Sequence, residues 1–401
     1  MPLLLQAQVS PTTPSILQHY ISQNSEAVYA TQQQFLANES LYSPWLKELE
    51  FRTETDEWDL ERQEYSVRLN LSSRGERRVE QSIQEHLQVG YGLKEKKIAA
   101  EHLSDGYRLL GAYRYTENRL ELLRNRRSLL EDRQTVHHRM LEYSSTVELD
   151  QILKGEKDLL NIEQQILLHE QQQQQLLSQL HLDSTFMAMW LTTTWISVDS
   201  MAANLLHLSE MAPQKNADQY WREYETDLAK LEMTLEERKA KRWINFVSLK
   251  QAGRERLNTG QEFSVGLALR IPTATTNRVK RNEAQLEWLD EQSKQSLLDQ
   301  KVSSRLHRCQ EEFEQAKTIW NLLTQQLEQQ NREELLVYYQ QFADVSPLSL
   351  LQIQMDDIDH QLQLIDWEEQ AYQLYVRLLD YRGEFLRRPE LNFVASELKV
   401  F

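Results

Sequence analysis

The sequence predicts a mainly α-helical chain in which long coiled-coil hairpins and short pairs of β-strands occur in two copies. Three observations support this fold class. The 401 residues include only 10 glycines and 8 prolines, whereas these two residue types make up roughly 12% of an average protein, so the elements must be long. A segment of alternating residues recurs about half a chain length later. Apolar residues in the second half follow the heptad spacing of a coiled coil.

The chain contains an internal repeat. The segment EYSVRLNL, Glu64 to Leu71, returns as EFSVGLAL, Glu262 to Leu269, and the same offset of 198 residues (262 − 64) carries Trp45 onto Trp243. Two matches at one offset indicate a duplicated unit of about 200 residues. We expect a terminal segment or signal-peptide remnant over residues 1–13, a first repeat over 14–212, a second repeat over 213–388 and a C-terminal tail over 389–401.

Each copy opens with a helical stretch, residues 14–42 and residues 217–242, and continues with two strands. Alternation with a period of two residues is typical of a strand that has one apolar and one polar face. The expected strands are Glu48–Asp56, Glu64–Leu71, Trp243–Lys250, which alternates least cleanly, and Phe263–Ile271. Strands of about nine residues approach the 9–11 that a tilted strand needs to cross a bilayer.

A long helical hairpin follows each strand pair. No glycine or proline lies between Pro272 and Pro347, and apolar residues there repeat in steps of four and three: Val302, Leu306, Cys309, Phe313, Ala316, Trp320, Leu323 and Leu327. This seam is typical of a coiled coil and assigns Cys309 to packing rather than to chemistry.

The first copy has a matching helix, from Glu76 to about Tyr143, whose early part we expect to be loosened by four glycines, Gly90, Gly92, Gly106 and Gly111. Returning helices are expected over residues 147–182 and 348–379.

This duplicated order of helix, two strands and long hairpin resembles the TolC family of outer-membrane efflux proteins, from about residue 14 to 385. The turn after the second strand of each copy is similar to the family's proline- or glycine-rich turn. It reads SSRGERR from Ser72 in the first copy and RIPT from Arg270 in the second. The segments Leu149–Leu153 and Ala343–Gln352 are similar to the start of its returning helices. The order and spacing carry the resemblance, because no single motif is specific.

The resemblance implies an assembly. Three chains would each contribute four strands to a 12-stranded β-barrel in the outer membrane, and their hairpins would form an α-barrel through the periplasm. It implies a passive exit duct of a tripartite efflux or type I secretion system, a homotrimer that works with a periplasmic adaptor (membrane fusion) protein and an inner-membrane pump, without a cofactor. Four strands alone would leave open sheet edges, which lipid does not tolerate.

The resemblance also implies three sets of site residues. The periplasmic entrance falls on Asp150, Ser349 and Gln352, of which the last two are uncharged where the family has acidic residues. The adaptor-contacting hairpin tips fall on Ser144, Ser145, Thr146, Asp344, Val345 and Ser346. The charged face of the strands would line a wet barrel lumen with Glu48, Glu50, Arg52, Glu54, Arg68 and Arg270.

Composition excludes several other classes of function. With 61 acidic and 45 basic residues and a net charge of −16, the chain lacks the basic surplus that nucleic-acid binding needs. Its one cysteine excludes a disulfide framework and a multi-cysteine metal site. There is no metalloprotease, nucleophile-elbow or phosphate-loop motif, so we expect no enzyme activity.

Two other interpretations stay open at this point. The chain could be a soluble periplasmic or cytoplasmic coiled-coil scaffold, in which the alternating segments form a small dimerisation sheet. It could also be a degenerate family member that no longer conducts.

Overall fold

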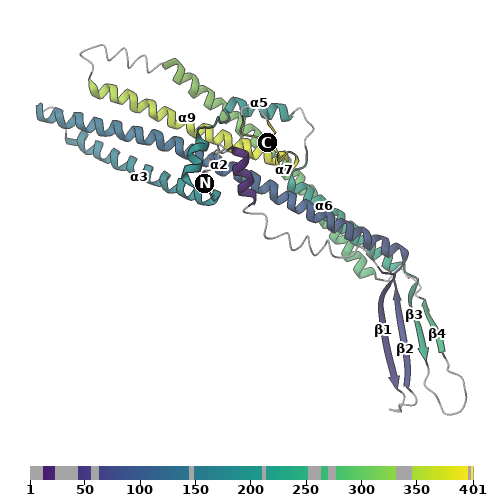
Figure 1. Cartoon of the computed structure of the whole chain (residues 1–401). Coiled ribbons are helices and arrows are strands. Elements are labelled where there is room, and N and C mark those ends of the chain that lie inside the picture. Colours follow the sequence, from purple (N-terminus) through teal and green to yellow (C-terminus); the bar gives the residue numbers. More distant parts are fainter. Residues whose placement is uncertain are drawn as a thin grey trace, which may run out of the picture. The chain divides into compact units, whose positions relative to one another are not determined.

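The structure is a computed structural model, and it describes residues 12–22, 44–55, 63–143, 149–209, 214–251, 263–269, 277–330, 346–395 and 399–400. Within these ranges residues 13–22 are helical. The other elements in chain order are β1 Leu46–Thr55, β2 Gln63–Leu71, α2 Arg74–Tyr143, α3 Leu149–Leu180, α4 Ser184–Leu191, α5 Val198–Ser209, α6 Ala217–Ala240, β3 Ile244–Gln251, β4 Phe263–Leu269, α7 Arg278–Gln330, α9 Pro347–Tyr381, α10 Glu384–Arg387, β5 Leu391–Asn392 and β6 Lys399–Val400 (Figure 1).

The predicted order of helix, strand pair and long hairpin is confirmed, including the least clean strand, which is β3. The short helices α4 and α5, near the end of the first repeat, are not predicted from the sequence. Of the opening helix expected over residues 14–42, the part beyond residue 22 lies outside the described residues.

The chain divides into two compact units, and each combines segments of both copies. The first, here called the strand unit, comprises Val28–Lys97 and Ala217–Lys301. The second, here called the hairpin unit, comprises Met1–Ala27, Ile98–Asn216 and Val302–Phe401.

The strand unit contains one antiparallel sheet of order β1-β2-β3-β4, whose four strands lie side by side in Figure 1. After β2 the chain turns into α2 through a capping motif. The Ser73 hydroxyl accepts a hydrogen bond from the backbone N–H of Glu76 at 3.1 Å, which satisfies one of the free donors at the start of the helix.

The glycines of the first copy do not loosen α2, which contradicts the expectation from the sequence. The helix runs unbroken through all of them. At Gly90 the ring of Tyr224 on α6 occupies the space of a side chain, since an added Cβ would lie 2.2 Å from that ring. The same ring stacks on His86 with centroids 4.5 Å apart, so the glycine allows α2 and α6 to approach closely.

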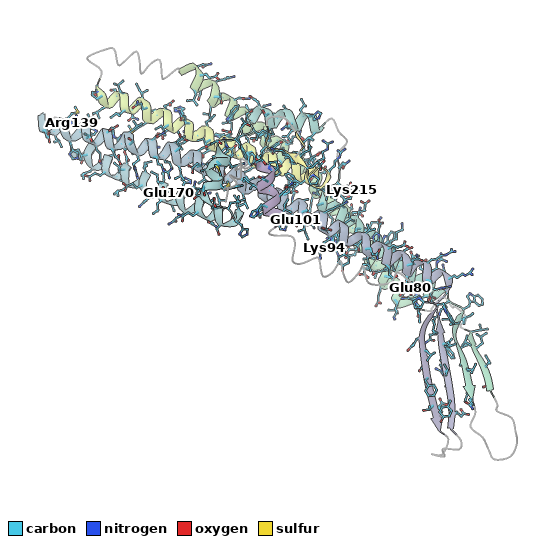
Figure 2. The ribbon with its side chains drawn as sticks, viewed as in Figure 1. Glu80, Lys94, Glu101, Arg139, Glu170 and Lys215 are labelled. Carbon is cyan, nitrogen blue, oxygen red and sulfur yellow. The ribbon has the colours of Figure 1, made fainter. Side chains whose placement is uncertain are left out.

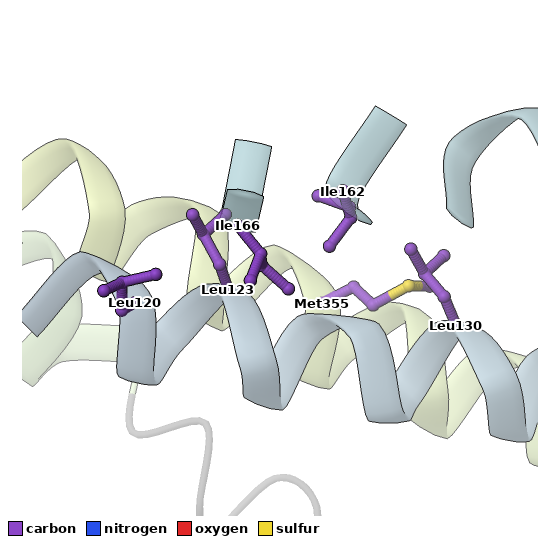
Figure 3. Close-up of a cluster of buried hydrophobic side chains, with 6 residues drawn as sticks. All are labelled: Leu120, Leu123, Leu130, Ile162, Ile166 and Met355. Carbon is purple, nitrogen blue, oxygen red and sulfur yellow. The ribbon is translucent and has the colours of Figure 1, made fainter. Parts of the chain in front are cut away.

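The hairpin unit has an aliphatic core and an aromatic core. Figure 3 shows the aliphatic cluster, which joins α2, α3 and α9 through Leu120, Leu123, Leu130, Ile162, Ile166 and Met355. In the predicted heptad seam of α7, Val302, Cys309, Phe313 and Ala316 are buried, as a coiled-coil seam requires.

The aromatic core closes around Tyr107, which is fully buried. Its hydroxyl donates to the Leu391 carbonyl at 3.1 Å, and its ring stacks on Phe385 at 5.4 Å. Tyr372 donates to the Tyr107 carbonyl at 2.8 Å, and Phe393 is also buried. The segment after α10 is therefore part of the core of this unit.

Candidate channel-forming site

The four-stranded sheet has two chemically different faces. Its register places apolar side chains in rows that run across all four strands. The two most complete rows are Leu49–Leu69–Val247–Leu267 and Phe51–Val67–Leu249–Val265. Several of these side chains are more than half exposed, among them Leu49, Phe51, Val265 and Leu267. A soluble sheet normally buries such a face, so this one requires an apolar partner.

The opposite face is charged and polar. The rows between the apolar ones are Glu48–Asn70–Phe246–Ala268, Glu50–Arg68–Ser248–Gly266 and Arg52–Ser66–Lys250–Ser264. Arg52 Nε donates to Glu50 at 2.7 Å, and Asn70 Nδ2 donates to Glu48 at 2.8 Å. Lys250 pairs with Glu64 across the strands. The face is therefore suited to water and solutes rather than to lipid.

The structure brings together most of the residues predicted for the lumen. Glu48, Glu50, Arg52 and Glu54 on β1 share this charged face with Arg68 on β2, whose guanidinium also lies 4.7 Å from the centre of the Phe246 ring. Arg270 lies outside the described residues.

Tryptophans stand at the same end of the sheet in both copies. Trp45 directly precedes β1, Trp243 directly precedes β3, and the two are 52% and 65% exposed. Toward the other end of β2, Tyr65 contacts Phe51. Aromatic rings at the ends of an apolar strand band are typical of the interface between lipid and water.

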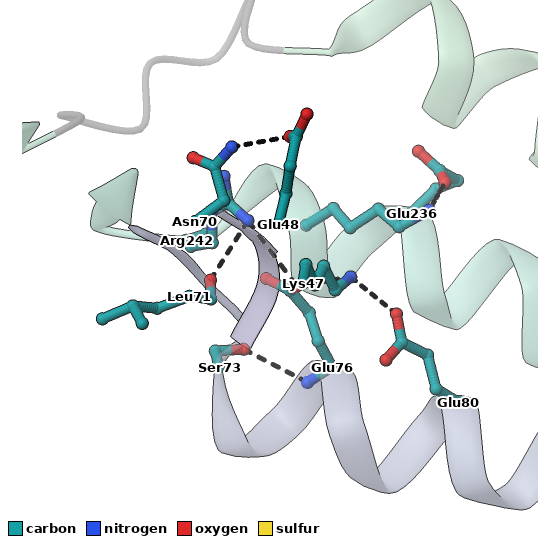
Figure 4. Close-up of polar contacts among 10 residues, drawn as sticks. Lys47, Glu48, Asn70, Leu71, Ser73, Glu76, Glu80, Glu236 and Arg242 are labelled. Carbon is teal, nitrogen blue, oxygen red and sulfur yellow. Dashed lines mark hydrogen bonds and ion pairs between the residues drawn. The ribbon is translucent and has the colours of Figure 1, made fainter. Parts of the chain in front are cut away.

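A buried carboxylate joins the sheet to α2, as Figure 4 shows. Glu76 is fully buried, and its Oε2 lies 3.3 Å from Lys47 Nζ on β1 and 3.9 Å from Arg242 Nη1 before β3. Arg242 also donates to the Leu71 carbonyl at 3.3 Å. The sequence interpretation missed this cluster, although the spacing from Ser73 to Glu76 is a capping-box signal.

The predicted entrance residues lie near the starts of the returning helices. Asp150 is exposed in the first turn of α3, and Ser349 is exposed in the first turn of α9. Gln352 is exposed as well, and its side-chain amide donates to Asp356 at 2.8 Å. Of the predicted tip residues only Ser346, the exposed N-cap residue of α9, is described; Ser144, Ser145, Thr146, Asp344 and Val345 lie outside the described residues.

Ion pairs connect α2 to both returning helices of the hairpin unit. Arg119 pairs with Asp366 at 2.7 Å and with Glu369 at 2.5 Å on α9. On α3, Glu170 (labelled in Figure 2) pairs with Arg124 at 3.0 Å. Burial raises the pKa of Glu368, which accepts a 3.5 Å hydrogen bond from the Tyr115 hydroxyl.

A stripe of exposed leucines follows α3 on the side opposite its buried residues. Leu153, Leu160 and Leu167 are spaced seven residues apart and are 53%, 61% and 56% exposed. The buried face of the same helix includes Ile162 and Ile166. An apolar heptad stripe facing solvent is the surface that a second helix covers in a coiled coil.

Two further features are absent from the residues that the structure describes, a metal-binding cluster and a membrane-spanning helix. In this part of the chain no group of three or more histidine, cysteine, aspartate or glutamate side chains could hold a metal ion. None of the described helices combines the length and apolar character of a membrane span.

Sequence comparison finds no matching protein-family model and no matching curated protein. Structure comparison does find relatives of the fold. The outer membrane protein VceC from Vibrio cholerae matches with a TM-score of 0.64 and 11% identity, over 92% of this chain and 96% of that one. The MtrE outer membrane channel of Neisseria gonorrhoeae matches with a TM-score of 0.60 and 14% identity, over 93% and 89%. A membrane protein from Pseudomonas aeruginosa gives 0.66 and 12%, over 92% and 90%.

These similarities span almost the whole of each chain, so they apply to the complete duplicated architecture and not to a shared hairpin. The resemblance to the TolC family is thereby confirmed at the level of the fold: the chain has the fold of outer-membrane efflux channels.

Proposed function

We propose that this chain is one protomer of a trimeric exit duct in the outer membrane, which passively conducts solutes for a tripartite efflux or type I secretion system. The observation that carries the proposal is the sheet of the strand unit. It has a continuous apolar face, a charged opposite face and two edges that lack partner strands within the described residues.

The edges β1 and β4 argue for several copies of the chain. Each presents a row of backbone groups that lipid would leave unsatisfied, at a cost of several kcal/mol per group. One chain cannot join its own β1 and β4, because a sheet of four strands is too narrow to close into a barrel. Three copies supply 12 strands in a closed barrel with no free edge, and an even strand number is the rule for bacterial barrels.

The helices extend the same argument. α2 has 70 residues, so it rises about 100 Å, far more than a bilayer requires. The exposed leucine stripe of α3, Leu153–Leu167, would be covered by a helix of a neighbouring copy, so that the hairpins together form an α-barrel in the periplasm.

Charge indicates the kind of cargo. The charged face of the sheet carries four acidic side chains, Glu48, Glu50, Glu54 and Glu64, against three basic ones, Arg52, Arg68 and Lys250. Arg270 is a further basic candidate, so the acidic character of the proposed duct rests mainly on the charge of the whole chain. The chain as a whole has a net charge of −16. An acidic lumen favours cationic over anionic solutes. At the entrance only Asp150 is charged, so a protomer would contribute one carboxylate where the family has more.

The partners follow from the proposed duct. It has no chemistry or energy source of its own, so an inner-membrane pump would drive the cargo. A periplasmic adaptor would contact the hairpin tips near Ser144–Thr146 and Asp344–Ser346.

The proposal is tested by exporting the chain into the periplasm of a Gram-negative host and fractionating the membranes. We expect a trimer in the outer membrane that opens conducting pores in planar bilayers. Recovery of a soluble monomer or dimer would favour the coiled-coil scaffold, and a membrane trimer that never conducts would favour a degenerate channel.

A further inference from the structure

A cavity of about 410 Å³ lies in the strand unit, where the helices meet the sheet. Its polar wall is formed by the end of α6 and the residues after it, Arg238, Lys241 and Arg242, together with Ser72 and Ser73 at the exit of β2. Its apolar wall is formed by Leu71, Trp243 and Ile244. We call this space the junction pocket.

The positive charge of the junction pocket is only partly neutralised. Arg242 is engaged by the Leu71 carbonyl and by Glu76. For Arg238 and Lys241, no carboxylate of the described residues lies within ion-pair distance. Gly75 lets the Arg238 side chain lie over the start of α2, because an added Cβ would stand 3.3 Å from Arg238 Cδ.

A guanidinium beside an ammonium group is a pair of donors suited to the oxygens of a phosphate. Arg238 and Lys241 supply this pair at the wall of the junction pocket. The Ser72 hydroxyl does not add to it, because its Oγ is buried and is not accessible from the pocket.

The apolar wall is continuous with the apolar face of the sheet. Leu71 pairs with Leu46 and Ile244 pairs with Leu269, at the end of the sheet nearest the helices. Leu269 is 63% exposed and Trp243 is 65% exposed. A ligand seated here would thus have an anionic group at the helix end and an apolar body along the strands.

Only the second copy of the repeat has the three basic residues of the junction pocket. At the offset of 198 residues, Arg238, Lys241 and Arg242 correspond to Ser40, Ser43 and Pro44. The adjoining tryptophan is present in both copies, as Trp45 and Trp243. The three cations are therefore not a requirement of the strand entry itself, since the first copy enters β1 without them.

We propose that the junction pocket binds the phosphate headgroup of an anionic glycerophospholipid, whose acyl chains lie against the apolar face beside Trp243. The inference rests on the proposed membrane position of the sheet. A lipid fits better than free phosphate because most of the pocket wall is apolar and leads onto the exposed strand face. Lys and Arg near a membrane surface attract anionic lipids with about 1 kcal/mol each.

Native mass spectrometry of the purified trimer tests the site, in micelles doped with phosphatidylglycerol or with zwitterionic phosphatidylcholine. We expect retained phosphatidylglycerol on the wild type, and a loss of affinity of about 30-fold in the double variant R238Q/K241Q. The matched control K230Q/K301Q removes two exposed lysines of the same unit and should bind as the wild type does. The charge-preserving variant R238K/K241R should also keep most of the binding.

The tryptophans supply a second comparison. Trp243→Ala should weaken phosphatidylglycerol retention several-fold, whereas Trp45→Ala in the other copy should not. Inorganic phosphate should not bind detectably to the lipid-free protein. When it is added to the lipid-bound protein, it should not displace the lipid.

Three results would overturn the lipid site while leaving the duct intact: equal retention of both lipids by a membrane trimer, equal loss in R238Q/K241Q and K230Q/K301Q, or displacement by millimolar phosphate. If the wild type is recovered only as a soluble monomer, the proposed function fails first and the lipid site fails with it.

Discussion

At the scale of single residues, two glycines two positions apart on α2 have opposite surroundings. Gly90 is buried against the ring of Tyr224, which is itself buried and stacked on His86. Gly92 is exposed, and a Cβ added there would meet nothing within 4 Å. The sequence alone treats both as weak points of a helix, because the difference between them is made by a residue 134 positions away from Gly90 (224 − 90).

This pair gives a direct test of the packing. Gly90→Ala should destabilise the protein by roughly 1–3 kcal/mol, because the ring cannot move aside without losing its stacking partner. Gly92→Ala should stabilise it by up to about 1 kcal/mol, because alanine is the better helix former. Urea or thermal unfolding of both variants measures the difference. Equal effects of the two substitutions would contradict the close approach of α2 and α6.

Glu368 gives a prediction on pH. Burial raises its pKa above the ordinary value of 4.5, so the folded protein binds this proton more readily than the unfolded chain does. The ionised group therefore costs stability at neutral pH, and the cost vanishes as the pH falls below the ordinary pKa. Glu368→Gln should raise the melting temperature by about 1–2 °C at pH 7.5 and leave it unchanged near pH 3.5.

The exposed Glu121 on α2 provides the matched substitution. Glu121→Gln should have little effect at either pH. A gain for Glu368→Gln that persists at pH 3.5 would point to a cause other than the buried charge.

At the scale of elements, the strands and hairpins could be predicted from periodicity, and even β3 followed from its place in the repeat. The strand expected from Glu48 begins two residues earlier, at Leu46, because its first residues complete a register with the end of β2 rather than an alternation in their own sequence. The cluster around Glu76 could not be predicted in this way. Its partners Lys47 and Arg242 come from different copies, and only the folded sheet brings them to the same carboxylate.

The leucine stripe of α3 carries a prediction of its own. Replacing Leu160 and Leu167 by serine should dissociate the trimer, because burial of a leucine side chain contributes about 1.5–3 kcal/mol and each protomer would lose two. Light scattering of the detergent-solubilised protein measures the mass.

The control changes two exposed glutamines on another face of the same helix, Gln165→Ser and Gln172→Ser, which costs similar helix propensity. This variant should stay trimeric. A trimer that tolerates loss of both leucines would show that neighbouring copies do not cover this stripe.

At the scale of the whole molecule, the two faces and two edges of the sheet demand different partners. The apolar face requires lipid or another apolar surface, the charged face is suited to water, and the edges require other strands. A soluble scaffold with one dimerisation sheet could cover the apolar face against a second copy, but it would leave the edges of β1 and β4 open. Edge pairing is therefore the property that best separates the duct from the scaffold.

Cysteine pairs on the two edges test it. One cysteine replaces Glu48, Glu50 or Arg52 on β1 and a second replaces Ser264, Gly266 or Ala268 on β4, so that nine combinations cover a range of registers between copies. Within one chain β1 and β4 are three strand spacings apart, about 14 Å, whereas a disulfide needs Cα atoms within about 7 Å. Every bond that forms must therefore join two chains. The native Cys309 will not interfere, because burial raises its pKa to about 11.

Mild oxidation should give cross-linked dimers and trimers, with the trimer as the largest species, since a closed ring of three has no free edge left to extend. The control is the double variant Ser66→Cys and Lys250→Cys, whose cysteines lie on the paired strands β2 and β3. It should form disulfides only within a chain, so it shows where the oxidised monomer migrates on a non-reducing gel. A ladder without an upper limit would mean that the edges polymerise rather than close. A cross-link that stops at the dimer in every combination would contradict closure by three copies. Monomers throughout would mean that β1 and β4 do not pair between copies, and this result would favour the scaffold, which leaves both edges open.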